Sequence, residues 1–316
     1  MEVNSFMEWR KSELKKIIFM LMVLIAGTVH GENITYKKNK KILTSIQAVY
    51  SIAKSLTKDT DIEVYSIFDS DVSMDYGKSA FDNKDLDLSS AKDAVAVVDV
   101  ARVWGNDYLY EYARRKNIRI IEIDASYSFS GNDYLSLSLL NYKNGDSNPY
   151  VWMSFQNVIK MANIIADDLS ELFPEDSKRI EDNLINFSQE IKEIENGYLE
   201  KTLDLSSLSV ITLTENLDYL FNDLNIFFNY VDSNELTVEK ISEVMKRNNS
   251  KIFVSDRWIK KEIINEIEKK GGKFLVLDNF NIPRELNEKM DPDGYLKGMK
   301  ENMEKLVEVM KIMDKK

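Results

Sequence analysis

The amino-acid sequence predicts an α/β fold with two lobes, each a parallel sheet flanked by helices, joined by one long rigid linking helix. Three observations support this. Short apolar segments alternate with helical patterns both before and after residues 148–203, which is typical of parallel sheets covered by helices. Residues 180–198 carry apolar side chains at alternating four- and three-residue steps, and the helix they belong to would be roughly 40 Å long. The chain has 316 residues and is 44% hydrophobic, so two lobes of ordinary size can each bury a core.

The N-terminal segment is expected to be a secretory signal peptide. Basic residues up to Lys16 precede an apolar run from Ile17 to Val29, and a small residue follows at Gly31. The run is shorter than the about 20 residues that a membrane-spanning helix needs, although an uncleaved N-terminal anchor stays open as an alternative. We therefore place a signal peptide at residues 1–31.

The first lobe is expected at residues 32–173. Its predicted strands are residues 40–45, 61–67, 94–98 and 118–123, and its predicted helices are residues 46–56 and 106–116. An aspartate-rich polar loop is predicted at residues 68–90 and irregular chain at residues 125–147. A loop that long inside a compact lobe is usually functional or disordered, and a merely solvated acidic loop is the alternative.

The centre of the chain is expected to connect the lobes. Pro149 favours extended chain over residues 148–153, Ser154 is placed to cap the helix that follows, and Pro174 ends that helix. The linking helix is predicted at residues 174–203.

The second lobe is expected at residues 204–316 and repeats the alternation of strands and helices. Its predicted strands are residues 209–213, 226–230, 251–256 and 273–278, and its predicted helices are residues 217–224, 237–247 and 295–313. The last two strands are apolar runs that each end in an aspartate, Asp256 and Asp278.

Composition excludes several function classes. A net charge of −11 and a pI near 4.9 argue against nucleic acid as a partner. There is no cysteine, and the only histidine, His30, lies in the predicted signal peptide. Disulfides, thiolate sites and triads that need histidine or cysteine are therefore excluded, and the 11 glycines form no phosphate loop. We do not predict an enzyme, and a carboxylate-pair hydrolase is the less favoured alternative.

Several motifs resemble those of the zinc/manganese-uptake solute-binding proteins. They are Asn148-Pro149-Tyr150-Val151-Trp152, the run at residues 164–172, Pro174-Glu175-Asp176, and Gly294-Tyr295-Leu296 with Asn302 and Lys305. The resemblance implies a protein of a periplasm or secreted, since the acylated cysteine of many family members is missing. It further implies capture of a metal ion or a metal-containing or small ligand between the lobes, an ABC permease as partner, and a monomer. A family descendant with a decayed metal site, acting as an adhesin or binding module, is the alternative function.

The resemblance also assigns four metal-ligand positions. Asp278 keeps the family's aspartate, Thr214 and then Glu215 stand where the family has histidine or glutamate, and Tyr150 replaces a histidine. The remaining position falls near Asp75. Oxygen ligands of this kind favour manganese, iron or calcium over zinc.

The strand ends add candidates of their own. Ligands of open parallel sheets sit beyond the carboxyl ends of the strands, which here are marked by polar residues, namely Ser45, Asp69, Asp99, Asp124, Thr212, Thr214, Glu215, Asp256 and Asp278. Arg257 and Trp258 would add a cationic fork and an aromatic face, suited to an anionic organic ligand or a chelate. A capping role for Asp256 or Asp278, and simple packing for Tyr150, stay open as alternatives.

Overall fold

The computed structural model describes residues 39–68, 72–83, 86, 89–128, 133–287 and 289–315. The predicted signal peptide and the strand-end residue Asp69 lie outside the described residues. Among the helices that are described, none is both long and apolar enough to cross a membrane.

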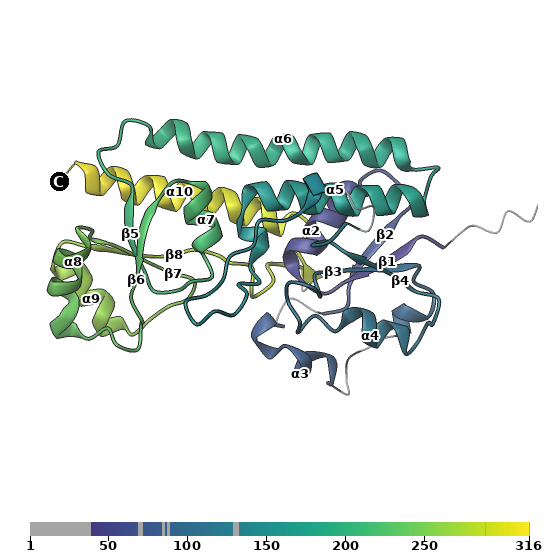
Figure 1. Ribbon diagram of the computed structural model, residues 1–316, viewed down its shortest axis with the longest axis horizontal. Helices are drawn as coiled ribbons and strands as arrows, with labels where there is room; N and C mark the ends of the chain where they lie inside the picture. Colours follow the sequence, from purple (N-terminus) through teal and green to yellow (C-terminus); the bar gives the residue numbers. More distant parts are fainter. Residues whose placement is uncertain are drawn as a thin grey trace, which may run out of the picture. The chain divides into compact units, whose positions relative to one another are not determined.

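The N-terminal lobe is built on a four-stranded parallel sheet in the order β2-β1-β3-β4 (Figure 1). The strands are β1 (Lys41–Thr44), β2 (Glu63–Ser66), β3 (Ala96–Asp99) and β4 (Ile121–Asp124). Alternate residues of these strands face two different cores, as expected for a sheet covered on both faces. Ile42 packs with helix α2 (Gln47–Leu56), whereas Leu43 packs with helix α4 (Leu109–Arg114).

The C-terminal lobe repeats this arrangement, with a four-stranded parallel sheet in the order β6-β5-β7-β8. Its strands are β5 (Ser209–Thr212), β6 (Phe227–Tyr230), β7 (Ile252–Ser255) and β8 (Lys273–Val276). Its helices are α7 (Asp218–Asp223), α8 (Ile241–Asn248) and α9 (Lys261–Lys269). A short hairpin of β9 (Glu285–Leu286) and β10 (Lys289–Met290) precedes the last helix. The prediction of two helix-flanked parallel sheets is confirmed.

The two lobes share one core beneath long helices. The helix α5 (Phe155–Leu172) begins at Ser154, whose side chain accepts a hydrogen bond from the Asn157 N–H, and the long helix α6 (Ser177–Thr202) follows. In Figure 1, α6 runs along α5 and α10 (Gly294–Asp314) on the same side of both sheets. The helix α10 contacts α2 of the first lobe and β7 of the second. The C-terminal helix α10 therefore connects the two lobes, in addition to the long helix α6.

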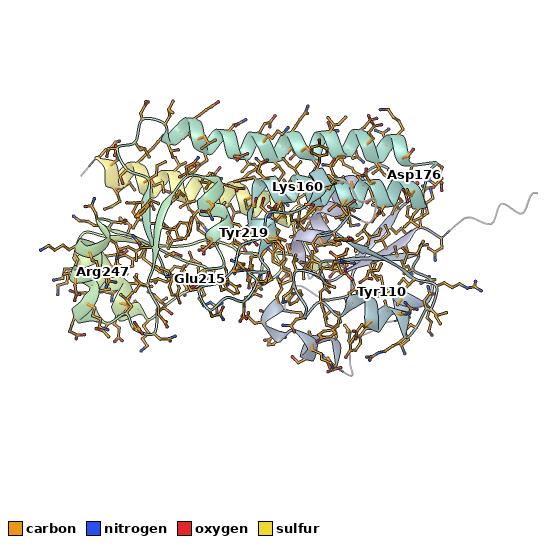
Figure 2. All side chains as sticks on the ribbon, viewed as in Figure 1. Tyr110, Lys160, Asp176, Glu215, Tyr219 and Arg247 are labelled. Atoms are coloured by element: carbon orange, nitrogen blue, oxygen red, sulfur yellow. The ribbon has the colours of Figure 1, made fainter. Side chains whose placement is uncertain are left out.

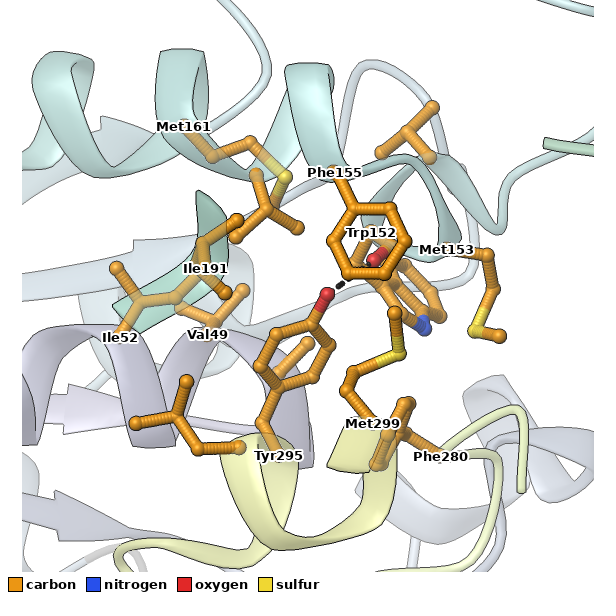
Figure 3. Close-up of a cluster of buried hydrophobic side chains, with 14 of the residues drawn as sticks. Val49, Ile52, Trp152, Met153, Phe155, Met161, Ile191, Phe280, Tyr295 and Met299 are labelled. Carbon is orange, nitrogen blue, oxygen red and sulfur yellow. Dashed lines mark hydrogen bonds between the residues drawn. The ribbon is translucent and has the colours of Figure 1, made fainter. Parts of the chain in front are cut away.

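The shared core is centred on aromatic side chains from the middle and end of the chain. Trp152, Phe155 and Tyr295 are buried together, and the Tyr295 hydroxyl donates a hydrogen bond of 2.6 Å to the Trp152 carbonyl (Figure 3). The Trp152 indole N–H in turn donates to the Asn279 carbonyl at 3.0 Å. These contacts fix the segment that precedes α5 against the C-terminal lobe.

Some local predictions from the sequence were wrong. Residues 151–153 form a 3-10 turn rather than extended chain, because the Met153 N–H bonds back to the Tyr150 carbonyl and buries all three side chains. The predicted loop at residues 68–90 contains short helices at Met74–Tyr76, Lys78–Phe81 and Ser89–Lys92. The helix α9 was not predicted, since only Ile263 and Ile267 of its residues are buried.

Candidate functional site

A buried carboxylate organises the loops at the carboxyl edge of the C-terminal sheet. Asp256 follows β7, and its side chain is only 2% exposed. One oxygen, Oδ2, accepts hydrogen bonds from Asn216 Nδ2 at 2.7 Å, Asn279 Nδ2 at 2.9 Å and Thr214 Oγ1 at 3.2 Å. The other, Oδ1, lies 3.2 Å from Arg257 Nε. Asp256 therefore ties together the loops that follow β5, β7 and β8.

Arg257 is held by this carboxylate but extends outward. Its side chain is 61% exposed. The hydrogen bond to Asp256 raises the pKa of the Arg257 guanidinium, and the charges of Asp75 and Tyr150 act in the same direction. The guanidinium is thus a fixed positive charge that lies close to groups from both lobes.

Tyr150 lies near Arg257 but is almost fully covered. It is 6% exposed and its ring lies 5.3 Å from the Trp152 ring, centroid to centroid. Burial raises the pKa of the Tyr150 phenol, and the carboxylates of Asp75 and Asp256 raise it further. At neutral pH the phenol keeps its proton, so it can serve as a hydrogen-bond donor more readily than as an anionic metal ligand.

Asp75 brings the N-terminal lobe to the same place. It lies in the 3-10 helix Met74–Tyr76, and its N–H donates to the capping Ser73 hydroxyl. The neighbouring Met74 N–H donates a 2.9 Å hydrogen bond to the Asn281 carbonyl of the C-terminal lobe. A depression of about 550 Å³ opens here, lined by Asp75, Asp256, Arg257, Trp258, Asp278 and Arg284 among others.

Asp278 faces this depression but already has partners. Its Oδ1 accepts a 2.8 Å hydrogen bond from the Phe280 N–H, and its Oδ2 lies 3.1 Å from Arg284 Nε. The Asp278 N–H donates a hydrogen bond to Asn302 Oδ1, and Asn302 Nδ2 donates one to the Asp278 carbonyl. Burial raises the pKa of the Asp278 carboxyl, and the charge of Arg284 opposes that shift.

Thr214 and Glu215 lie on a neighbouring depression of about 1110 Å³, which also includes Asp256, Arg257 and Trp258. The Glu215 side chain accepts a 2.7 Å hydrogen bond from the Lys143 N–H, and its carbonyl accepts from Asn148 Nδ2. Glu215 is labelled in Figure 2 at the edge of the C-terminal lobe. The Trp258 side chain, 77% exposed, stands where the two depressions adjoin.

The structure therefore gathers Asp75, Arg257 and Asp278 around one depression and places Thr214 and Glu215 on the adjoining one. Tyr150 lies near Asp75 and Arg257 but lines neither depression. Within the described residues there is no group of three acidic or histidine side chains that could hold a metal ion. The central position of Asp256, its bonds to Asn216 and Asn279, and the role of Arg284 were not predicted. The asparagines that follow β5 and β8 were the available signal, since side-chain amides at strand ends can bond to a neighbouring carboxylate.

Most of the chain matches one family model. The family model described as the periplasmic component A of the zinc-uptake complex matches residues 42–309. A zinc-binding protein AdcA of Streptococcus pyogenes serotype M1 is 22% identical over 96% of this chain, and the chain spans 59% of that relative's length.

Solved structures share the fold. A structure of FpvC from Pseudomonas aeruginosa in complex with Mn²⁺ has a TM-score of 0.67 at 18% identity, covering 87% of this chain and 100% of that one. A crystal structure of ZnuA has a TM-score of 0.65 at 18% identity, covering 85% and 98%. A Zn(II)-bound ZnuA-like domain of Streptococcus pneumoniae AdcA has a TM-score of 0.64 at 18% identity, covering 86% and 99%.

Proposed function

The chain belongs to the family of the periplasmic component A of the zinc-uptake complex, and from this membership we propose that it captures its solute in the depression between Asp75 and Arg257. The family consists of solute-binding proteins of metal ABC importers. The proposed solute is a metal ion or a small ligand that contains one. The protein would bind it outside the cytoplasm and deliver it to a permease in the membrane. The related structures with Mn²⁺ and Zn(II) support a divalent metal as part of that solute.

One observation carries the choice of site. Asp75 comes from the N-terminal lobe, Arg257 and Asp278 come from the C-terminal lobe, and all three line one depression. A solute held there would contact both lobes at the carboxyl edges of their sheets, where ligands of open parallel sheets bind. The carboxylate of Asp75 makes no ion pair with another described residue, so it remains available to a metal. Asp278, in contrast, would first have to weaken its ion pair with Arg284.

The shared core limits how the site can close. Since α10 contacts both lobes and Trp152 is bonded to Asn279 across them, a large hinge rotation would break buried contacts. We therefore place closure in the segment around Asp75, which is attached to the C-terminal lobe through Met74 and Ser73. The working unit in this proposal is a monomer.

Metal analysis of cells tests the function directly. In a strain that lacks this protein and grows under metal limitation, we expect a lower content of at least one of zinc, manganese, iron and nickel, measured by plasma mass spectrometry. The wild-type gene should restore the content, and an Asp75→Asn variant should restore it poorly. Asp182→Asn, a change of the same kind on α6 and remote from the depression, is the matched control. Unchanged contents of all four metals in the deletion strain would refute the proposal.

A further inference from the structure

The carboxylates around the depression are poorly suited to a bare metal ion. A divalent cation held by protein oxygen atoms alone takes about six ligands at roughly 2.0 to 2.6 Å. Asp256 is occupied by four donors, and Asp278 is paired with Arg284. A bare ion would have to displace these partners, and each released donor would lose a charge-assisted hydrogen bond.

Arg257 supplies the opposite kind of contact. Only its Nε is bonded to Asp256, and its terminal nitrogens make no hydrogen bond to any other part of the chain that the structure describes. Two parallel N–H groups of a guanidinium match the two oxygens of a carboxylate. A positive charge held at this point repels a bare cation and attracts an anionic group.

The space and the aromatic surface fit something larger than an ion. The depressions of about 550 Å³ and 1110 Å³ adjoin at Arg257 and Trp258. Sites for small organic molecules usually have volumes of about 300 to 1,000 Å³. The exposed Trp258 side chain offers a flat face beside the guanidinium, and its own ring contact, with Phe274 at 6.0 Å, leaves the side chain 77% exposed.

We propose that the solute of this protein is a metal ion already bound by a small multivalent carboxylate, whose free oxygens pair with Arg257 while the metal faces Asp75. This inference rests on the proposed function, because it names the solute class of the same site. The chelating ligand then supplies most of the oxygen donors that the chain lacks. A polycarboxylate without metal could still pair with Arg257, but it would lose the attraction between the metal and Asp75 and would bind more weakly.

Calorimetry with defined probes tests the inference. The purified protein is titrated with ferric citrate, with trisodium citrate and with manganese chloride, and binding of ferric citrate is followed in parallel by quenching of tryptophan fluorescence. We expect micromolar binding of ferric citrate, at least tenfold weaker binding of citrate alone, and weaker binding still of manganese chloride. Arg257→Gln should weaken ferric citrate binding at least tenfold.

Two control variants separate a site from a general charge effect. Arg247→Gln removes an exposed arginine on α8, labelled in Figure 2 and outside both depressions, and should leave binding unchanged. Trp258→Phe should abolish most of the quenching while the protein stays folded by circular dichroism. Equal losses from Arg257→Gln and Arg247→Gln would overturn the inference.

The remaining outcomes distinguish the inference from the function. Equal binding of citrate with and without iron overturns the inference, because the metal then adds nothing to recognition and the free anion is the solute form. Tight binding of manganese chloride, unaffected by Arg257→Gln, overturns the inference and leaves the proposed function intact. Absence of binding by every probe also overturns the inference, and the metal content of the deletion strain then decides the function separately.

Discussion

Replacing Asp99 by asparagine should stabilise the protein at neutral pH. Asp99 ends β3 and is fully buried, and neither carboxylate oxygen has a hydrogen-bond partner in the described part of the chain. Burial raises the pKa of Asp99 well above its ordinary value, and the nearby carboxylates of Asp107, Asp124 and Glu122 raise it further. Asp107 is buried beside it, with a pKa raised to about 6.

The sign of the pH dependence follows from these shifts. A carboxyl group whose pKa is raised in the folded state binds protons more tightly there than in the unfolded chain. Its contribution to stability is complete below the unfolded pKa of about 3.9 and is lost as the pH rises through the folded value. For Asp107, a rise from 3.8 to about 6 corresponds to about 3 kcal/mol lost by pH 7.

For Asp99 the magnitude follows from the missing partners. A buried polar group without hydrogen bonds costs about 1 to 3 kcal/mol, and a charged group costs more. An asparagine at this position would carry no charge, and its amide could donate to the carboxylates that now repel Asp99. We therefore expect Asp99→Asn to raise the free energy of unfolding by about 1 to 3 kcal/mol at pH 7 and to have little effect at pH 4.5.

Urea unfolding at pH 4.5, 6 and 7.5, followed by circular dichroism, measures this difference. Asp124→Asn is the matched control, since Asp124 accepts hydrogen bonds from the Arg102 N–H and from both the N–H and the hydroxyl of Ser126. Its amide variant cannot accept all of these, and we expect it to lower the free energy of unfolding by about 1 to 3 kcal/mol. An Asp99→Asn protein that is less stable than the wild type at pH 7.5 would refute the reasoning.

Three further outcomes are expected. Zinc should bind no tighter than micromolar in competition with a chelating dye, because the chain has no cysteine and no histidine other than His30; nanomolar affinity would show that carboxylates suffice. Small-angle scattering with and without ferric citrate should give the same radius of gyration, since the lobes share a core, and a difference beyond error would indicate hinge closure. Asp278→Asn should leave the free energy of unfolding within about 1 kcal/mol of the wild type, because burial disfavours the Asp278 charge while the partly exposed pair with Arg284 favours it; a larger loss of stability would show that the pair with Arg284 outweighs burial.

Local patterns in the sequence were sufficient for most of the fold. The helix break at Pro174, the cap at Ser154 and the apolar strand ending in Asp99 depend on neighbouring residues alone, and the structure has each of them. The strand β7 ends at Ser255, one residue before the predicted Asp256. The helix α9 escaped because its charged sequence packs through only two buried isoleucines.

The site was harder to predict because its contacts join distant loops. Asp256 bonds to Asn216 and Asn279, which lie 40 and 23 residues away. Asp75 lies close enough to Tyr150 for its charge to raise the pKa of the phenol, but the two residues belong to segments with unrelated sequence patterns. Spacing along the chain carries no information about such encounters, whereas the parallel strand order of the C-terminal sheet places the loops of Asn216, Asp256 and Asn279 at one edge.

A shift of one residue explains why the aspartates that close corresponding strands have opposite surroundings. Val98 of β3 pairs with Thr44 as Val254 of β7 pairs with Thr212, so the two strands occupy corresponding places in their sheets. Asp99 comes one residue after Val98, still within the ladder and paired with Asp124 of β4, so its side chain is buried among other carboxylates. Asp256 comes two residues after Val254, beyond the end of β7, where loop side chains donate to it. Because neighbouring residues of a strand point to opposite faces, this shift gives the C-terminal sheet a satisfied anion that fixes Arg257 at the depression. In the N-terminal sheet it leaves an acid whose charge the fold does not stabilise.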